Sequence, residues 1–301
     1  MKRRRLRVLW PLAALALLAG LAMCRARPIV RSQAEAPPAE WLRVDFIDVG
    51  HGDAALITSP TGKSVLIDGG SREAGHAVVE HLRQRQIGRL DLVLVSHRHE
   101  DHIGGLAQVI SSVGARLFMD APSEHDSRVY QKLMDRLKEH QIPVRQAERG
   151  RRVDLGRGAW LTLLGPPDPP ILKAHSEENA NSVMARLDYG RFSVLFAGDA
   201  EAASEAWLLA SGADVAATVL KVGHHASATS SSPAFLAAVR PRLAVVSADA
   251  DDAQKEGHQE VFQRLERLGI RAMRTDLEGT ITIKTDGSAV QVQTKDRRES
   301  L

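Results

Sequence analysis

A dense cluster of histidine and aspartate residues constrains the fold of this chain more than any other feature. It reads SHRHEDHIGG, occupies residues 96–105 and directly follows an apolar run typical of a buried strand. His97 and His99 share one face of an extended backbone, and Asp101 and His102 follow where the chain turns. Neutral imidazoles and carboxylates suit zinc, and also manganese or iron. The cluster therefore predicts a site for two neighbouring metal ions rather than a surface loop that is rich in histidine by chance.

The composition is that of a globular chain without a cysteine-based site. Apolar residues make up 44% of the sequence, enough to fill a sizeable core, so a disordered chain is excluded. Cys24 is the single cysteine, which excludes an internal disulfide and a cysteine-based zinc site. The net charge of +3 does not by itself argue for a nucleic-acid partner. Glycine-rich phosphate loops and serine nucleophile elbows are also absent from the sequence.

The first residues, 1–24, predict a signal peptide or a membrane anchor. Five basic residues lie within positions 2–7, and an apolar segment follows at 9–23. That segment is short for a membrane span of about 20 residues. The residues before Cys24 resemble a lipoprotein processing site, except that Met23 stands where a small residue is usual. We therefore expect an exported protein, periplasmic or otherwise extracytoplasmic, with or without an anchor in the inner membrane.

The rest of the chain predicts a linker, one large domain and a short tail. Residues 25–40 contain three prolines and form the expected linker, residues 41–295 the folded domain, and residues 296–301 a polar tail. Strands are expected at 42–47, 54–58, 64–67, 90–95, 160–164, 182–187, 192–196, 215–222, 243–247, 280–285 and 289–293. Helices are expected at 74–85, 128–140, 200–211, 235–239 and 260–268. This order predicts an α/β fold with two mixed β-sheets covered by helices.

Several segments together resemble the metallo-β-lactamase superfamily, whose hallmark is His-x-His-x-Asp-His. Besides the histidine cluster, the matching segments are FIDVGHGDA at 46–54, LIDGG at 66–70, NSV at 181–183, FAGD at 196–199 and LKVGHHAS at 220–227. Within the superfamily they are most similar to the hydrolase domain of ComEC-type DNA-uptake (competence) proteins. The resemblance covers nearly the whole expected domain. It implies a four-layer αββα sandwich with the metals at strand ends between the two sheets.

The resemblance also implies roles for residues outside the cluster. Asp199 is expected to bridge two cations, although it could instead cap the helix after it. One of His224 and His225 is expected to bind the second metal, and the other to stabilise negative charge. The sequence leaves this open, and we take His225 as the ligand. Ala226 stands where the family usually has glycine. The expected metal ligands are then His97, His99, Asp101, His102, Asp199 and His225, and the expected catalytic residues are Asp101, Asp199 and His224.

Four further residues are candidates for contacts behind the ligands or with substrate: Asp68, Asn181, Ser227 and His258. Asp68 is expected to orient a ligand histidine or to serve as a turn residue before two glycines. Asn181 stands near where many members have a histidine ligand, which would leave the first metal more open. His258 is expected either to face the site or simply to begin a helix. His175 could take the place of the histidine ligand missing at Asn181, although we interpret it as a loop residue. We expect no site role for the remaining histidines, His51, His76, His81, His125 and His140.

These residues predict an exported or membrane-anchored dinuclear hydrolase. Its cofactors are two divalent metal ions, zinc first and manganese or iron as alternatives, and a metal-bridging hydroxide is the expected nucleophile. The family resemblance implies a phosphodiester substrate such as single-stranded DNA, although aromatic residues make up only 4% of the chain and no stacking platform is evident. Apart from the inner membrane at the N-terminal segment, no obligate protein partner is expected. The alternatives are hydrolysis of a lactone or thioester, or a non-catalytic metal-binding scaffold.

Overall fold

The computed structural model describes residues 41–249 and 256–301. The expected signal or anchor segment at 1–24 and the linker at 25–40 lie outside the described residues. Among the helices of the described part, none is long and apolar enough to cross a membrane.

A large mixed sheet contains the first strands of the described chain. Its strands are β1 (Leu42–Phe46), β2 (Ala55–Thr58), β3 (Ser64–Ile67), β4 (Leu92–Leu94), β5 (Phe118–Asp120), β6 (Val144–Gln146), β14 (Ile281–Thr285), β15 (Val290–Gln293) and β16 (Arg298–Ser300). In the described residues this sheet has nine strands, in the order β16-β15-β14-β1-β2-β3-β4-β5-β6. Strands β3 to β6 run parallel, whereas the others pair antiparallel.

A second mixed sheet follows in the C-terminal half. Its strands are β7 (Arg152–Gly156), β8 (Ala159–Leu163), β9 (Ala185–Tyr189), β10 (Phe192–Phe196), β11 (Val219–Lys221), β12 (Leu243–Val246) and β13 (Arg271–Arg274). Within the part of the chain that the structure covers, it has seven strands in the order β13-β12-β11-β10-β9-β8-β7. Strands β10 to β13 run parallel, and β7 to β10 form antiparallel pairs.

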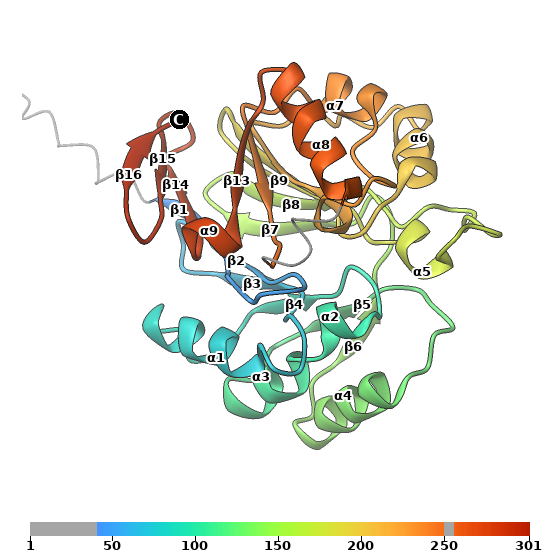
Figure 1. Cartoon of the computed structure of the whole chain (residues 1–301). Coiled ribbons are helices and arrows are strands. Elements are labelled where there is room, and N and C mark those ends of the chain that lie inside the picture. The colour runs from blue at the N-terminus through green and yellow to red at the C-terminus, as the bar shows by residue number, and fades with distance from the viewer. Residues whose placement is uncertain (1–40, 250–255) are drawn as a thin grey trace, which may run out of the picture. The chain divides into compact units, whose positions relative to one another are not determined.

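Helices cover the outer face of each sheet (Figure 1). The helical segments are α1 (Gly75–Gln84), α2 (Glu100–Ile103), α3 (Leu106–Ser112), α4 (Arg128–Glu139), α5 (Glu177–Ala180), α6 (Ala202–Ala210), the 3-10 turn η1 (Gly223–Ala226), α7 (Pro233–Val239), α8 (Glu256–Arg267) and α9 (Thr275–Glu278). Helices α1, α3 and α4 pack on the nine-stranded sheet, and α6, α7 and α8 pack on the seven-stranded sheet. The layers therefore follow the order αββα, as expected.

The alternation of side chains along the strands explains these layers. In β1 the side chains of Leu42, Val44 and Phe46 face the other sheet, where they meet residues such as Phe196. In β4 the neighbouring side chains alternate between two cores: Leu92 and Leu94 face the second sheet, and Val93 faces the helices. A strand that is buried on both faces is apolar at every position, which is why the run before the histidine cluster shows no polar alternation.

Two expected boundaries were wrong. We expected the folded domain to end at residue 295 and a polar tail to follow, but residues 298–300 form β16 and pair with β15 at the edge of the nine-stranded sheet. Exposed polar residues in an edge strand show no alternating apolar pattern, so β16 cannot be recognised from the sequence. The strand expected at 182–187 begins at Ala185, because the preceding residues turn toward the site.

Candidate metal centre

The candidate site lies where parallel strands of both sheets end. Asp68 follows β3, and His97 follows β4 after a short connection. In the other sheet Asp199 follows β10, and His225 follows β11. Polar side chains gather at the carboxyl ends of parallel strands because the chain turns there toward its crossover helices, and ligands commonly bind at this edge.

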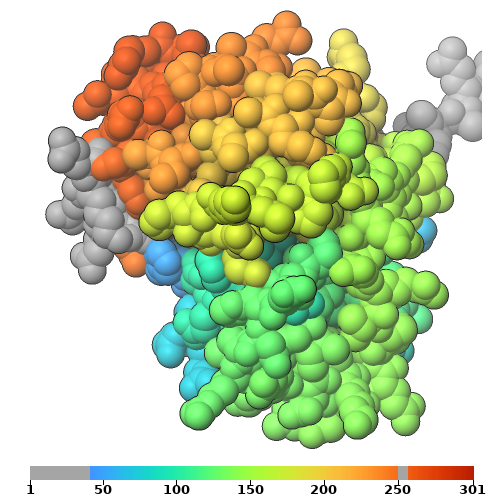
Figure 2. Space-filling model, turned by 90° about the vertical axis from the view of Figure 1, so that its right-hand side faces the viewer, coloured from blue at the N-terminus to red at the C-terminus, as the bar shows by residue number. Residues whose placement is uncertain are grey.

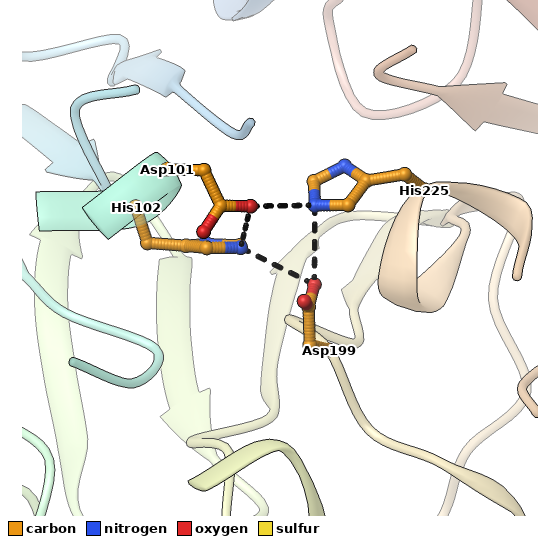
Figure 3. Close-up of side chains that lie close together, drawn as sticks. All are labelled: Asp101, His102, Asp199 and His225. Atoms are coloured by element: carbon orange, nitrogen blue, oxygen red, sulfur yellow. Dashed lines mark ion pairs between the residues drawn. The ribbon is translucent and has the colours of Figure 1, made fainter. Parts of the chain in front are cut away.

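One group of donor atoms draws on both sheets (Figure 3). The Nε2 atom of His102 lies 3.5 Å from Oδ2 of Asp101 and 3.3 Å from Oδ1 of Asp199. The Nε2 atom of His225 lies 3.2 Å from Oδ2 of Asp101 and 3.6 Å from Oδ1 of Asp199. One donor atom of each of these four residues lies within 4.8 Å of the others. We call Asp101, His102, Asp199 and His225 the four-residue group.

A second group shares Asp199 with the first. The Nε2 atom of His97 lies 3.6 Å from Oδ2 of Asp199 and 3.1 Å from Nδ1 of His99. We call His97, His99 and Asp199 the three-residue group, whose donor atoms also lie within 4.8 Å of one another. Asp199 therefore directs Oδ1 toward one group and Oδ2 toward the other. A single carboxylate in this position can join two cations.

The hydrogen bonds of the buried atoms fit a divalent cation. The Nε2 atoms of His102 and His225 and Oδ1 of Asp199 are buried without a hydrogen-bond partner among the described residues. Buried polar atoms without a partner are rare because each costs about 1–3 kcal/mol. Nδ1 of His225 lies 3.1 Å from the carbonyl oxygen of Ser247, which can only accept, so this nitrogen carries the proton. The Nε2 lone pair of His225 is then free for a metal.

Asp68 orients the second imidazole of the four-residue group. Its Oδ2 atom lies 3.0 Å from Nδ1 of His102 and accepts a hydrogen bond of 2.7 Å from the Ser96 hydroxyl, while Oδ1 accepts from the Ser96 backbone N–H at 2.7 Å. A carboxylate on one ring nitrogen of a histidine fixes the tautomer in which the other nitrogen is free to bind metal. Asp68 thus lies where the sequence placed an orienting residue.

The electrostatics of the site favour added positive charge. Burial alone would raise the pKa of Asp199, but the imidazoles of His102, His225 and His97 hold it well below its ordinary value. Burial likewise opposes protonation of His102, yet the carboxylates of Asp199 and Asp68 raise its pKa well above the usual range. Burial, aided by His102, lowers the pKa of His97. The Asp199 carboxylate is therefore ionised at neutral pH and attracts cations.

The backbone of η1 separates the two neighbouring histidines. His224, His225 and Ala226 have positive φ angles of 48°, 52° and 68°. This left-handed path sends the two rings different ways: the side chain of His225 is 4% exposed, whereas that of His224 is 28% exposed. The Nε2 atom of His224 lies 3.9 Å from Oδ2 of Asp199 and 3.3 Å from Nδ2 of Asn179. His224 therefore faces the opening of the site rather than the four-residue group.

A cavity of about 530 Å³ opens onto both groups. Its described lining consists of His51, His99, Asp101, His175, Ser176, Asn179, Asp199, His224, His225, Ser227 and His258. The expected Ser227 and His258 are thus at the cavity. The yellow-green segment that contains α5 lies between the green and the orange parts of the surface in Figure 2.

One expectation was wrong, and two are narrowed by the structure. His51, for which no site role was expected, lies 3.4 Å from Oδ2 of Asp101. His175, expected as a substitute ligand or a loop residue, lines the cavity. Asn181 does not line this cavity but one of about 450 Å³ that His97 also lines; its Oδ1 accepts from the backbone N–H of Ile171 at 2.8 Å and its Nδ2 donates to the Ile171 carbonyl at 2.8 Å, so it fastens a loop.

The sequence also missed Asn179. It is 3% exposed, contacts His224 and lines the cavity. In the sequence, the only indication of a role for Asn179 was its position two residues before Asn181. Which of the two asparagines faces the cavity depends on where the short helix α5 begins.

Comparison with known proteins identifies the family of this chain. Residues 47–250 match the sequence profile of the family described as the metallo-beta-lactamase superfamily. ComE operon protein 3 of Bacillus subtilis is 28% identical over 79% of this chain, which spans only 32% of that protein. A UPF0173 metal-dependent hydrolase of Cupriavidus necator is 27% identical over 58% of this chain and 53% of its own length. Among solved structures, the CmlA β-hydroxylase E377D mutant superposes with a TM-score of 0.54 at 14% identity, over 81% of this chain and 54% of that one.

Proposed function

This chain belongs to the metallo-beta-lactamase superfamily and is a metal-dependent hydrolase, and from that premise we propose that it hydrolyses phosphodiesters with two divalent metal ions. One observation carries the proposal: the two oxygens of Asp199 face two different groups of donor atoms. One fold supports many kinds of chemistry, so the argument depends on this ligand set rather than on the fold.

The donor set supports zinc. His97, His99 and Asp199 would hold one ion, and Asp101, His102, Asp199 and His225 the other. Imidazole nitrogen and carboxylate oxygen suit zinc, and they also accept manganese and iron. When bound, two such ions lower the pKa of a water molecule toward neutrality and polarise the bond that is attacked.

The protein's own groups have separate tasks in this proposal. Asp101 and Asp199 supply negative charge, and Asp199 keeps the two groups at a fixed separation. His224 lies at the cavity, outside both groups, and stabilises the charge that develops on the attacked oxygen. Nδ2 of Asn179 and Oγ1 of Thr229 lie 3.3 and 3.1 Å from Nε2 and Nδ1 of His224 and hold its ring at the cavity. To stabilise the attacked oxygen, Nε2 must carry a proton and exchange its contact with Asn179 for one with that oxygen.

For the substrate we propose single-stranded DNA. The support is the similarity to ComE operon protein 3 and to ComEC-type competence proteins, of which this chain spans about a third. The described lining of the cavity contains no lysine or arginine. Contacts with a polyanion therefore centre on the diester at the metals and not on a long basic groove.

We also propose that the domain works outside the inner membrane, on the strength of the basic and apolar segments at 2–7 and 9–23. We expect a reporter fused after Leu301 to be active only outside the cytoplasm. A reporter active only in the cytoplasm would contradict export.

The function is tested with the full chain loaded with zinc or manganese. We expect hydrolysis of bis-p-nitrophenyl phosphate and of single-stranded DNA. Hydrolysis of a lactone or a thioester instead would replace the phosphodiesterase proposal, and metal binding without any hydrolysis would leave a scaffold.

A matched pair of variants tests the roles of the two neighbouring histidines. We expect His224→Ala to keep both metals and lose about 100- to 1,000-fold in kcat, the usual effect of removing one charge-stabilising donor. His225→Ala should lose one metal. The reverse pattern would exchange their roles.

A further inference from the structure

A buried ion pair joins the two sheets behind the four-residue group. Lys221, the last residue of β11, is 3% exposed, and its Nζ atom lies 2.8 Å from Oδ1 of Asp53, which is 5% exposed. The same ammonium donates to the carbonyl of Val222 at 2.9 Å. A lysine is almost never buried this deeply unless it is paired, because desolvation of its charge is costly.

Asp53 contacts the segments that carry two of the four ligands. Its backbone N–H donates to the carbonyl of Asp101 at 3.2 Å. Its carboxylate oxygen Oδ1 lies 3.5 Å from Nδ1 of His225, beside the 3.1 Å contact from that nitrogen to Ser247. Asp53 lies between β1 and β2 of the nine-stranded sheet, whereas Lys221 ends β11 of the other sheet and His225 lies in η1, which follows β11. The ion pair therefore fixes the distance between a ligand from each sheet.

Lys221 also explains a third group of donor atoms. Asp53, Asp68 and His102 bring three donor atoms within 4.8 Å of one another, which would otherwise suggest another metal site. The Lys221 ammonium already supplies the positive charge at Asp53. The ammonium and Nδ1 of His225 face the same oxygen of Asp53, at 2.8 and 3.5 Å. Loss of the ammonium would therefore leave the carboxylate free to compete with the Ser247 carbonyl for the Nδ1–H of His225.

We propose that Lys221 and Asp53 are positioning residues that set the metal affinity of the four-residue group through the orientation of His225. The proposal rests on the two-metal site proposed above but not on the identity of the substrate. Groups that hydrogen-bond to a ligand histidine typically change metal affinity by about 10- to 100-fold when they are removed.

The test uses the full chain with Lys221→Met, Asp53→Asn and the double variant. Binding of Zn²⁺ is measured by competition with a chromophoric chelator, and the visible spectrum of the Co²⁺-loaded protein reports the geometry around the metal. We expect each variant to bind one of its two metals about 10- to 100-fold more weakly and to change the Co²⁺ spectrum. The matched control is Arg85→Met, which breaks another buried ion pair, 2.7 Å from Asp45, and should lower the melting temperature without changing metal affinity.

The double variant distinguishes a loss of metal affinity from a failure to fold. Lys221→Met alone leaves a buried carboxylate without a partner and could unfold the chain, whereas the double variant removes both charges. Wild-type affinity and a wild-type Co²⁺ spectrum in the double variant would overturn the proposal, whatever its melting temperature. A native chain that binds two metals but hydrolyses no phosphodiester would leave this inference standing and would overturn only the proposed substrate. A native chain that binds no metal would overturn both.

Discussion

The imidazole of His102 is held between two carboxylates: Nδ1 lies 3.0 Å from Oδ2 of Asp68, and Nε2 lies 3.3 Å from Oδ1 of Asp199. The first contact places the ring proton on Nδ1, so Nε2, which faces Asp199, keeps its lone pair for a metal ion that the two residues would share. His102 and Asp68 are 0% and 1% exposed, so the contact at Nδ1 is shielded from solvent. The metal-binding nitrogen of His102 is thus determined by a residue outside both donor groups.

Substitution of Asp68 by asparagine should therefore weaken metal binding without removing a ligand. The amide places an N–H donor against Nδ1 of His102, so the ring proton moves to Nε2, where it blocks the metal. We expect affinity for one metal to fall by about 10- to 100-fold, measured by chelator competition. Asp45→Asn, at a buried carboxylate outside both donor groups, is the control. Unchanged affinity in Asp68→Asn would show that Asp68 is only a turn residue.

Two neighbouring glycines should respond differently to alanine. Gly52 has a φ of +113°, and a Cβ there would lie 2.1 Å from the carbonyl oxygen of Asp101. Gly50 has a φ of +67° with nothing within 4 Å of such a Cβ. Gly50→Ala should lower stability by about 1 kcal/mol through backbone strain alone. Gly52→Ala must also displace Asp101, so it should weaken metal binding. The melting temperature of each variant is measured with and without metal. If added metal raises the melting temperatures of Gly52→Ala and Gly50→Ala equally, Gly52 does not position Asp101.

The Asp45 carboxylate should make stability depend on acidity. Burial raises the pKa of Asp45, but hydrogen bonds from His81, Arg85 and Thr282 outweigh it and lower the pKa from 3.8 to about 2. The folded state therefore binds this proton less readily than the unfolded state. The resulting stability, about 2 kcal/mol, is complete above pH 4 and is lost as the pH falls toward 2. Asp45→Asn should be less stable than the native chain at pH 7, with a smaller difference at pH 3 in urea denaturation. An equal difference at both pH values would contradict this account.

Much of the architecture follows from apolar runs in the sequence. Strands β4 and β12 are buried and apolar at every position, and β10 departs from this only at the buried Ser193, so each is a short apolar segment that ends where the site begins. Strand β1 instead alternates apolar residues with Arg43 and Asp45. Strand β6, by contrast, is exposed at all three positions, because it lies at the edge of its sheet. Such a strand is held by backbone hydrogen bonds and carries no pattern that a sequence can reveal.

Spacing alone predicted the part of the site whose residues are adjacent in sequence, whereas Asp68, Asp199 and His225 were expected from the resemblance to a family. His97, His99, Asp101 and His102 form one local cluster, and the structure brings them to Asp199. Asn179 and Asn181 look alike in the sequence, but hydrogen bonds to Ile171 turn the second away from the cavity. The pairing of Lys221 with Asp53 depends on how the two sheets pack, which no local pattern contains.

The bridging role of Asp199 is the central claim, and the metal content of Asp199→Asn at graded Zn²⁺ concentrations tests it most directly. The amide removes the negative charge that the two groups share, so both metals should bind more weakly, whereas His99→Ala should weaken only one. Turnover should fall by about 1,000-fold or more, and circular dichroism should be unchanged because the buried strands supply most of the stability. Retention of both metals by Asp199→Asn at native affinity, with near-native turnover, would show that Asp199 only precedes a helix and would contradict the two-metal account.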